Sequence, residues 1–83
     1  MLYKVKVIVM PRKGILDPQG QAVARALYTM DYKGINSIRI GKHLEMEIEG
    51  ENQQVVEETV KEMCEKLLAN TVIEDYRFCI KEA

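Results

Sequence analysis

Apolar and charged residues alternate in four separate stretches of the chain, the period of a β-strand with one buried face. These stretches are residues 3–10, 37–40, 43–49 and 76–81. The first departs from strict alternation, because Ile8 and Met10 add apolar side chains to the face that otherwise carries lysines. Gly41-Lys42 separates the second and third stretches, so we expect these two to form a hairpin with a short turn.

Two further stretches repeat apolar residues every three to four positions, which is typical of a helix with one buried stripe. Asp17 precedes Pro18, giving the first helix an N-cap and a proline at a position where the missing N–H costs nothing. Asn52 is the candidate cap of the second helix. The stripes are Val23, Ala26, Leu27 and Met30 in the first helix, and Val56, Val60, Met63, Cys64 and Leu67 in the second.

The resulting order, β-α-β-β-α-β, predicts one domain over residues 1–83 with a ferredoxin-like α/β (α+β) sandwich. We expect a four-stranded antiparallel sheet of order 4-1-3-2, with both helices on one face. Eight strand residues are then expected in the core beneath the two helices: Val5, Val7, Ile38, Ile40, Met46, Ile48, Tyr76 and Phe78. The helix residues expected to cover them are Val23, Leu27, Val60 and Leu67.

Charge is unevenly distributed, although the net charge is only −1. Residues 1–42 hold eight lysines and arginines against two aspartates, and residues 43–83 hold four against eleven acidic residues. The predicted sheet places Lys4 and Lys6 beside the row of glutamates at 45, 47 and 49, where each exposed pair contributes about 0.2–1 kcal/mol. An acidic central strand without outward aromatic residues argues against an RNA-recognition surface.

Few residues have the pattern of a chemical site. Cys64 and Cys79 lack the spacing of a disulfide framework or a metal site, and they favour a reducing cytoplasm. His43 has no second ligand near it and is interpreted as a solvated side chain. The longest apolar run, residues 7–10, is far shorter than a membrane helix, and the N-terminal alternation is unlike a signal peptide. We expect no catalytic, cofactor or metal site.

The most suggestive polar cluster is Arg12 and Lys13 ahead of Asp17 and Pro18. Two cations and the free N–H groups of a helix start can receive a phosphate. Asp17 would repel an anion, however, and Pro18 removes a donor, so a protein-contact or solvated loop is the favoured interpretation.

An oligomer interface is expected on the sheet face without helices. Leu2, Ile8, Met10 and Cys79 fall on that face, where a lone small domain would carry polar groups. A chain of 83 residues buries only about 60–65% of its unfolded surface, so association would help its stability. We predict a homodimer or a dimer of dimers.

Three segments, Lys13–Val23, Ile38–Lys42 and Met63–Phe78, together resemble the PurS family, the small subunits of phosphoribosylformylglycinamidine synthase. The resemblance implies a cytoplasmic, non-catalytic subunit of an ATP-dependent C–N ligase complex of purine biosynthesis. Its partners would be a glutaminase subunit and a large synthetase subunit, with ATP and magnesium on the latter and ammonia passing between them. Partner contacts are expected near the matching segments, at Arg12, Lys13, Gln19, Arg39 and Lys42.

Two other classes share this element order. An ACT-like dimer that binds a small regulatory molecule is the main alternative. An acylphosphatase-like enzyme would need an arginine phosphate cradle with a catalytic asparagine, and no suitable asparagine accompanies Arg12.

Overall fold

Three strands and two helices make up the computed structural model, which describes residues 1–83. They are β1 (Leu2–Pro11), α1 (Pro18–Thr29), β2 (Lys42–Glu49), α2 (Gln53–Met63) and β3 (Glu74–Glu82), with a π-helical turn η1 (Cys64–Leu68) continuing α2. Neither helix has the length and apolarity needed to cross a membrane.

The sheet is antiparallel with the order β2-β1-β3. β1 is therefore the central strand, as the predicted order requires. Lys4 lies opposite Glu47 and Lys6 opposite Glu45, so the predicted charge pairing across strands is confirmed in register. None of the ion pairs within 4.0 Å includes either lysine. The lysines and glutamates therefore lie in two neighbouring rows of opposite charge without forming direct ion pairs.

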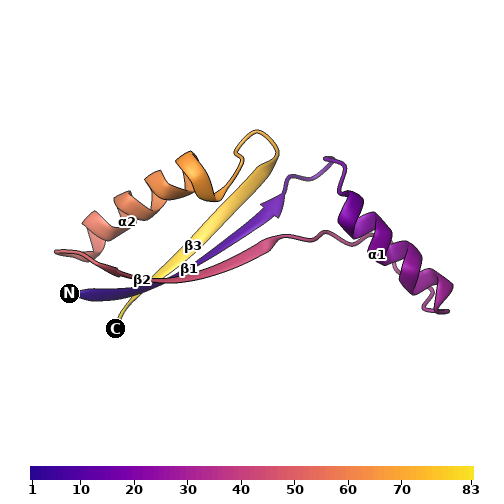
Figure 1. Cartoon of the computed structure of the whole chain (residues 1–83), viewed down its shortest axis with the longest axis horizontal. Helices are drawn as coiled ribbons and strands as arrows, with labels where there is room; N and C mark the ends of the chain where they lie inside the picture. The colour runs from indigo at the N-terminus through magenta and orange to yellow at the C-terminus, as the bar shows by residue number, and fades with distance from the viewer.

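The core lies between β1 and α2. Every second residue of β1 is buried, and α2 packs its apolar stripe against that face (Figure 1). Asn52 caps α2 as predicted, accepting a hydrogen bond of 2.9 Å from the Val55 N–H. The fully or almost fully buried hydrophobic residues are Tyr3, Val5, Val7, Val9, Val56, Val60, Cys64 and Ala69.

Leu67 was expected in this core, but 83% of its surface is exposed. The cause is the π-helical turn, in which the Ala69 N–H bonds to the Cys64 carbonyl at 2.9 Å. One extra residue in that turn rotates the following side chains relative to the stripe. Leu67 therefore points away from the sheet, while Cys64 and Ala69 remain inside.

The structure also differs from the predicted four-stranded sandwich in two respects. Residues 37–40 form no strand, and α1 lies beyond the end of the sheet instead of covering it (Figure 1). The chain does not turn back at Gly41-Lys42, a weak hairpin signal, but runs extended into β2. Consequently Ile38 and Ile40 are only half-buried and outside the sheet, and Val23 is 40% exposed.

We call residues 1–11 and 42–83 the body, and residues 12–41 the arm. All buried hydrophobic residues belong to the body, and the arm's only buried residue is Gly20. The radius of gyration is 16.5 Å, whereas a compact domain of this length has about 12 Å. The arm thus extends from the body without a core of its own.

Candidate partner-binding surface

Asp17 holds the two parts of the arm together. Its carboxylate accepts one hydrogen bond from the Gly20 N–H at 3.0 Å, the predicted N-cap, and a second from the Ile40 N–H at 2.8 Å. These N–H groups, joined by the charge of Arg39, lower the pKa of Asp17. An added Cβ at Gly20 would collide with the Ile38 carbonyl. The start of α1 is therefore fixed against the segment that leads into β2.

Three of the five predicted contact residues donate hydrogen bonds to distant carbonyl groups of their own chain. Arg12 donates from Nη2 to the Thr71 carbonyl at 2.7 Å, which occupies the guanidinium that a phosphate cradle would need. Arg39 donates from Nη1 to the Pro11 carbonyl at 3.0 Å, and Lys42 from Nζ to the Leu68 carbonyl at 3.2 Å. Sequence reasoning missed this internal role, because no local pattern marks partners so distant in the chain.

Lys13 and Gln19 are exposed and make no ion pair. Lys13 lies with Arg39 at two hollows on the surface. The first, of about 620 Å³, lies between the start of α1 and residues 36–39. The second, of about 570 Å³, we call the junction hollow. It is lined by Ile8, Met10, Pro11, Lys13, Arg39, Asp75, Tyr76 and Arg77.

Residues of two surfaces that are predicted separately from the sequence lie together at the junction hollow. Ile8 and Met10, predicted at an oligomer interface, lie here beside the predicted partner-contact residues Lys13 and Arg39. Leu2 lies near the opposite end of β1, and Cys79 lies opposite Lys6 in mid-sheet. The hollow thus combines an apolar floor with a mainly cationic rim, in which Lys13, Arg39 and Arg77 outnumber Asp75, and it leaves Leu2 and Cys79 outside.

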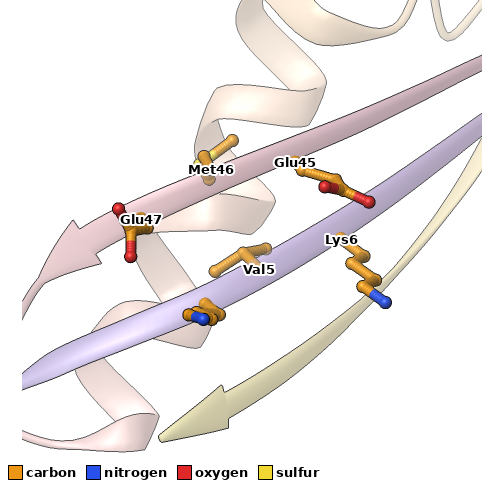
Figure 2. A pocket seen from close by; sticks show the side chains of 6 residues that line it. Val5, Lys6, Glu45, Met46 and Glu47 are labelled. Atoms are coloured by element: carbon orange, nitrogen blue, oxygen red, sulfur yellow. The ribbon is translucent and has the colours of Figure 1, made fainter. Parts of the chain in front are cut away.

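A further hollow, of about 370 Å³, lies over β1 and β2 (Figure 2). Figure 2 shows Glu45 and Glu47 on β2 and Lys6 on β1, and the strand register places Glu45 opposite Lys6. Val5 and Met46 alternate with these charged residues along the same two strands. Acidic and basic groups alternate across this surface, so neither sign of charge gathers there. It has the character of an exposed sheet face.

Tyr76 and Cys64 also have shifted pKa values, and both shifts have a structural cause. Tyr76 donates from its hydroxyl to Glu65 at 2.8 Å, and this bond raises the pKa of Tyr76 to about 12. Burial raises the pKa of the Cys64 thiol, which makes it less reactive. His43 lies 3.2 Å from Glu45 at the surface. No three His, Cys, Asp or Glu side chains are grouped to hold a metal ion.

Comparisons with known proteins agree over nearly the whole chain. The family described as PurS: Phosphoribosylformylglycinamidine (FGAM) synthase matches residues 4–82. The PurS subunit of phosphoribosylformylglycinamidine synthase from Bacillus subtilis is 53% identical over 81 residues, which is 98% of this chain and 95% of that protein. The corresponding subunit from Methanocaldococcus jannaschii is 40% identical over 98% of both chains.

Solved structures show the same likeness. A Bacillus subtilis PurS crystal structure has a TM-score of 0.85 and 54% identity, covering 96% of this chain and 99% of its own. A chain in a structure described as PurLQS from Thermotoga maritima has a TM-score of 0.86 and 33% identity, covering 98% and 99% respectively.

Proposed function

The chain belongs to the PurS family of phosphoribosylformylglycinamidine synthase subunits, and on this premise we propose that it is the non-catalytic adaptor of that complex. It bridges the glutaminase subunit and the large synthetase subunit and helps to form the route for ammonia between them. ATP and magnesium act on the large subunit, and this chain supplies protein contacts alone.

The observation that carries the proposal is the full-length likeness to a chain of the PurLQS structure. That likeness includes the backbone of both the body and the arm, which supports a common role for the two chains. The match over residues 4–82 favours this function over an ACT-like regulatory module.

The junction hollow has the composition of a docking surface. Its apolar floor, from Ile8 and Met10, and its cationic rim, from Lys13 and Arg39, resemble the apolar centre and polar rim of protein interfaces. Arg39 is already fixed by its bond to the Pro11 carbonyl, so less side-chain freedom is lost when a partner binds.

An adaptor has a physical purpose in such a reaction. Ammonia released into bulk water near neutral pH is protonated and is then no longer a nucleophile. A closed protein interface excludes water from the reacting molecules. The groups with shifted pKa values in this chain are engaged in caps, ion pairs and packing, which agrees with a supporting role.

The experiment mixes the glutaminase and synthetase subunits with glutamine, ATP and formylglycinamide ribonucleotide, with and without this chain. We expect glutamine-driven turnover to require the chain. We expect its dependence on the chain to be weaker when concentrated ammonium replaces glutamine. Equal glutamine-driven rates with and without the chain would refute the adaptor function.

Two charge reversals test the docking surface. Lys13→Glu alters the rim of the junction hollow, whereas Lys81→Glu makes the same charge change on β3, outside that hollow. We expect Lys13→Glu to raise the chain concentration needed for half-maximal turnover about tenfold, equivalent to about 1.4 kcal/mol. Lys81→Glu should leave it within about twofold. Equal effects of the two reversals would exclude this hollow as the contact.

A further inference from the structure

The two most exposed large hydrophobic side chains of the chain lie in one short segment after α2. They are Leu67 and Val72, with 83% and 80% of their surface exposed. A single exposed leucine or valine is ordinary on a protein surface, so exposure alone implies no function. The backbone that carries these two side chains is unusual, however, both in its helical form and in its hydrogen bonds.

The π-helical turn η1 turns Leu67 into solvent. In an uninterrupted α-helix Leu67 would follow Val60 by about 700°, or nearly two full turns, and would lie on the buried stripe. The extra residue in η1, closed by the bond from the Ala69 N–H to the Cys64 carbonyl, rotates it outward. Such π-turns are rare and are frequent at functional sites. The exposure of Leu67 is therefore set by the backbone.

The loop after η1 is held by the two cations at the ends of the arm. Lys42 donates from Nζ to the Leu68 carbonyl at 3.2 Å. Arg12 donates from its side chain to the Thr71 carbonyl at 2.7 Å and from its backbone N–H to the Ile73 carbonyl at 2.8 Å. A surface that is fixed in advance loses less conformational freedom when a partner binds.

Asn70 fixes the same loop from within. Its backbone carbonyl accepts hydrogen bonds from the N–H groups of Ile73 and Glu74 at 3.0 and 2.8 Å. Its side-chain oxygen accepts a bond of 3.2 Å from the Val72 N–H, and its own N–H donates to the Glu74 carboxylate at 2.7 Å. Val72 is thus held in solvent by a loop whose backbone is bonded along its length.

A hollow of about 450 Å³ lies beside Leu67. It is lined by Thr59, Glu62, Met63, Lys66, Leu67 and Leu68. Glu62 and Lys66 form an ion pair at 2.6 Å, so their charges offset each other and the rest of the lining is largely apolar. We call this hollow, together with Leu67 and Val72, the η1 surface.

The helix that borders the η1 surface is acidic. Residues 53–68 hold four glutamates against two lysines. Glu58 and Lys61 are exposed there, and neither forms an ion pair within 4.0 Å. The junction hollow has the opposite character, with a mainly cationic rim. The chain therefore carries two apolar surfaces with rims of opposite sign.

These two surfaces belong to opposite faces of the sheet. α2, which η1 continues, packs on the face of β1 that carries Val5, Val7 and Val9. Ile8 and Met10, which form the floor of the junction hollow, alternate with those residues and lie on the other face. A chain that joins two proteins needs two surfaces that both can reach at once, and this arrangement supplies them.

We propose that the η1 surface is a second docking surface of the adaptor, and this inference rests on the proposed function. Its occupant is the subunit of the complex that does not bind at the junction hollow. That subunit presents an apolar patch bordered by lysines and arginines, because its charge must complement the acidic helix. A basic patch of this kind is repelled by the cationic rim of the junction hollow, so the two surfaces take different partners.

Two substitutions of Leu67 test the contact in the reconstituted complex. Leu67→Ser removes the apolar side chain, whereas Leu67→Met keeps one of similar volume. Because Leu67 is exposed, we expect both variants to unfold at the urea concentration of the wild-type chain. We expect Leu67→Ser to raise the chain concentration needed for half-maximal glutamine-driven turnover at least about tenfold, and Leu67→Met less than about threefold. Equal effects of the two substitutions would overturn the inference.

Two charge reversals on α2 test the chemistry of the occupant. Glu58→Lys removes negative charge beside the η1 surface, and Lys61→Glu adds it. A basic partner predicts that Glu58→Lys raises the half-maximal concentration about threefold or more, while Lys61→Glu leaves it unchanged or lowers it. The reverse order, or equal weakening by both variants, would contradict a basic partner.

Photo-cross-linking in the working complex identifies the occupant. Benzoylphenylalanine replaces Leu67, Lys13 or, as a control, Lys81, which lies near the far end of β3 from η1. We expect position 67 to label one of the two other subunits and position 13 to label the other, with little product from position 81. Labelling of the same subunit from positions 67 and 13 would overturn the inference. So would a cross-link from position 67 to a second copy of this chain.

The same titrations separate this inference from the proposed function. If glutamine-driven turnover does not depend on the wild-type chain, the adaptor function fails and the inference fails with it. If the wild-type chain is required but Leu67→Ser and Glu58→Lys titrate as the wild type does, the adaptor function stands and the η1 surface is not its contact.

Discussion

The body should provide nearly all of the stability of a single chain, and Val60→Ala measures this. Val60 has no exposed surface and lies in the core cluster between α2 and β1. Removing two methyl groups forfeits about 1.6 kcal/mol of transfer free energy and about 1 kcal/mol for the cavity, while the better helix propensity of alanine returns about 0.5 kcal/mol. The expected loss in the free energy of unfolding is about 2 kcal/mol.

Val55→Ala is the matched control, because Val55 lies on the same helix and is 41% exposed. Truncating Val55 loses little buried area and leaves no cavity, and the better helix propensity of alanine offsets part of that loss. The expected loss in the free energy of unfolding is therefore about 0.5 kcal/mol or less. Urea unfolding of both variants and the wild-type chain at one fixed protein concentration gives the comparison, since stability depends on concentration if chains associate.

At about 4–8 °C per kcal/mol for a domain of this size, Val60→Ala should lower Tm by about 8–16 °C. A loss below about 0.5 kcal/mol for Val60→Ala would show that the packing of α2 on β1 is not the main source of stability. Losses of equal size for both variants would show that burial in the core does not decide the outcome.

Two remaining predictions concern groups with shifted pKa values. Asp17→Asn keeps one acceptor oxygen and loses the charge, so it should lower Tm at pH 7. Because the pKa of Asp17 is lowered by folding, this difference should vanish as pH falls well below about 4, and a constant difference would contradict the assigned hydrogen bonds. Tyr76 should ionise near pH 12 in an absorbance titration, and Glu65→Gln should bring that step back toward 10. Its stabilising bond is present below pH 10 and is lost as pH rises through 12, so an unchanged titration in Glu65→Gln would exclude the bond.

The parts of the fold that local patterns determine could be predicted from the sequence. Alternation located β1 and β3, and the caps at Asp17 and Asn52 were recognised because each side chain bonds within its own first turn. The position of Lys4 and Lys6 beside the row of glutamates on β2 followed from the order of the elements and the expected sheet order. All of these depend on residues close in sequence or on a general rule of sheet topology.

The candidate site was predicted less well, because its geometry depends on distant partners. Arg12, Arg39 and Lys42 were identified as surface cations, but the carbonyls that they contact belong to residues 59, 28 and 26 positions away in the chain. Ile8 and Met10 were placed on the correct face of β1. Their proximity to Lys13 could not be predicted, because it depends on where the arm leaves the body. The types of these residues pointed to a binding surface, but no sequence pattern indicated which of them lie together.

The missing strand and displaced helix have a related cause. A period of two at residues 37–40 and a stripe on α1 indicate which kind of surface each segment can pack against, and they do not indicate where that surface lies. Its position depends on whether the chain turns at Gly41, where an added Cβ would meet the Val9 carbonyl and the Met10 sulfur as the extended chain passes β1. Because the chain runs straight through Gly41 into β2, residues 37–40 lie outside the sheet and α1 lies beyond its end (Figure 1).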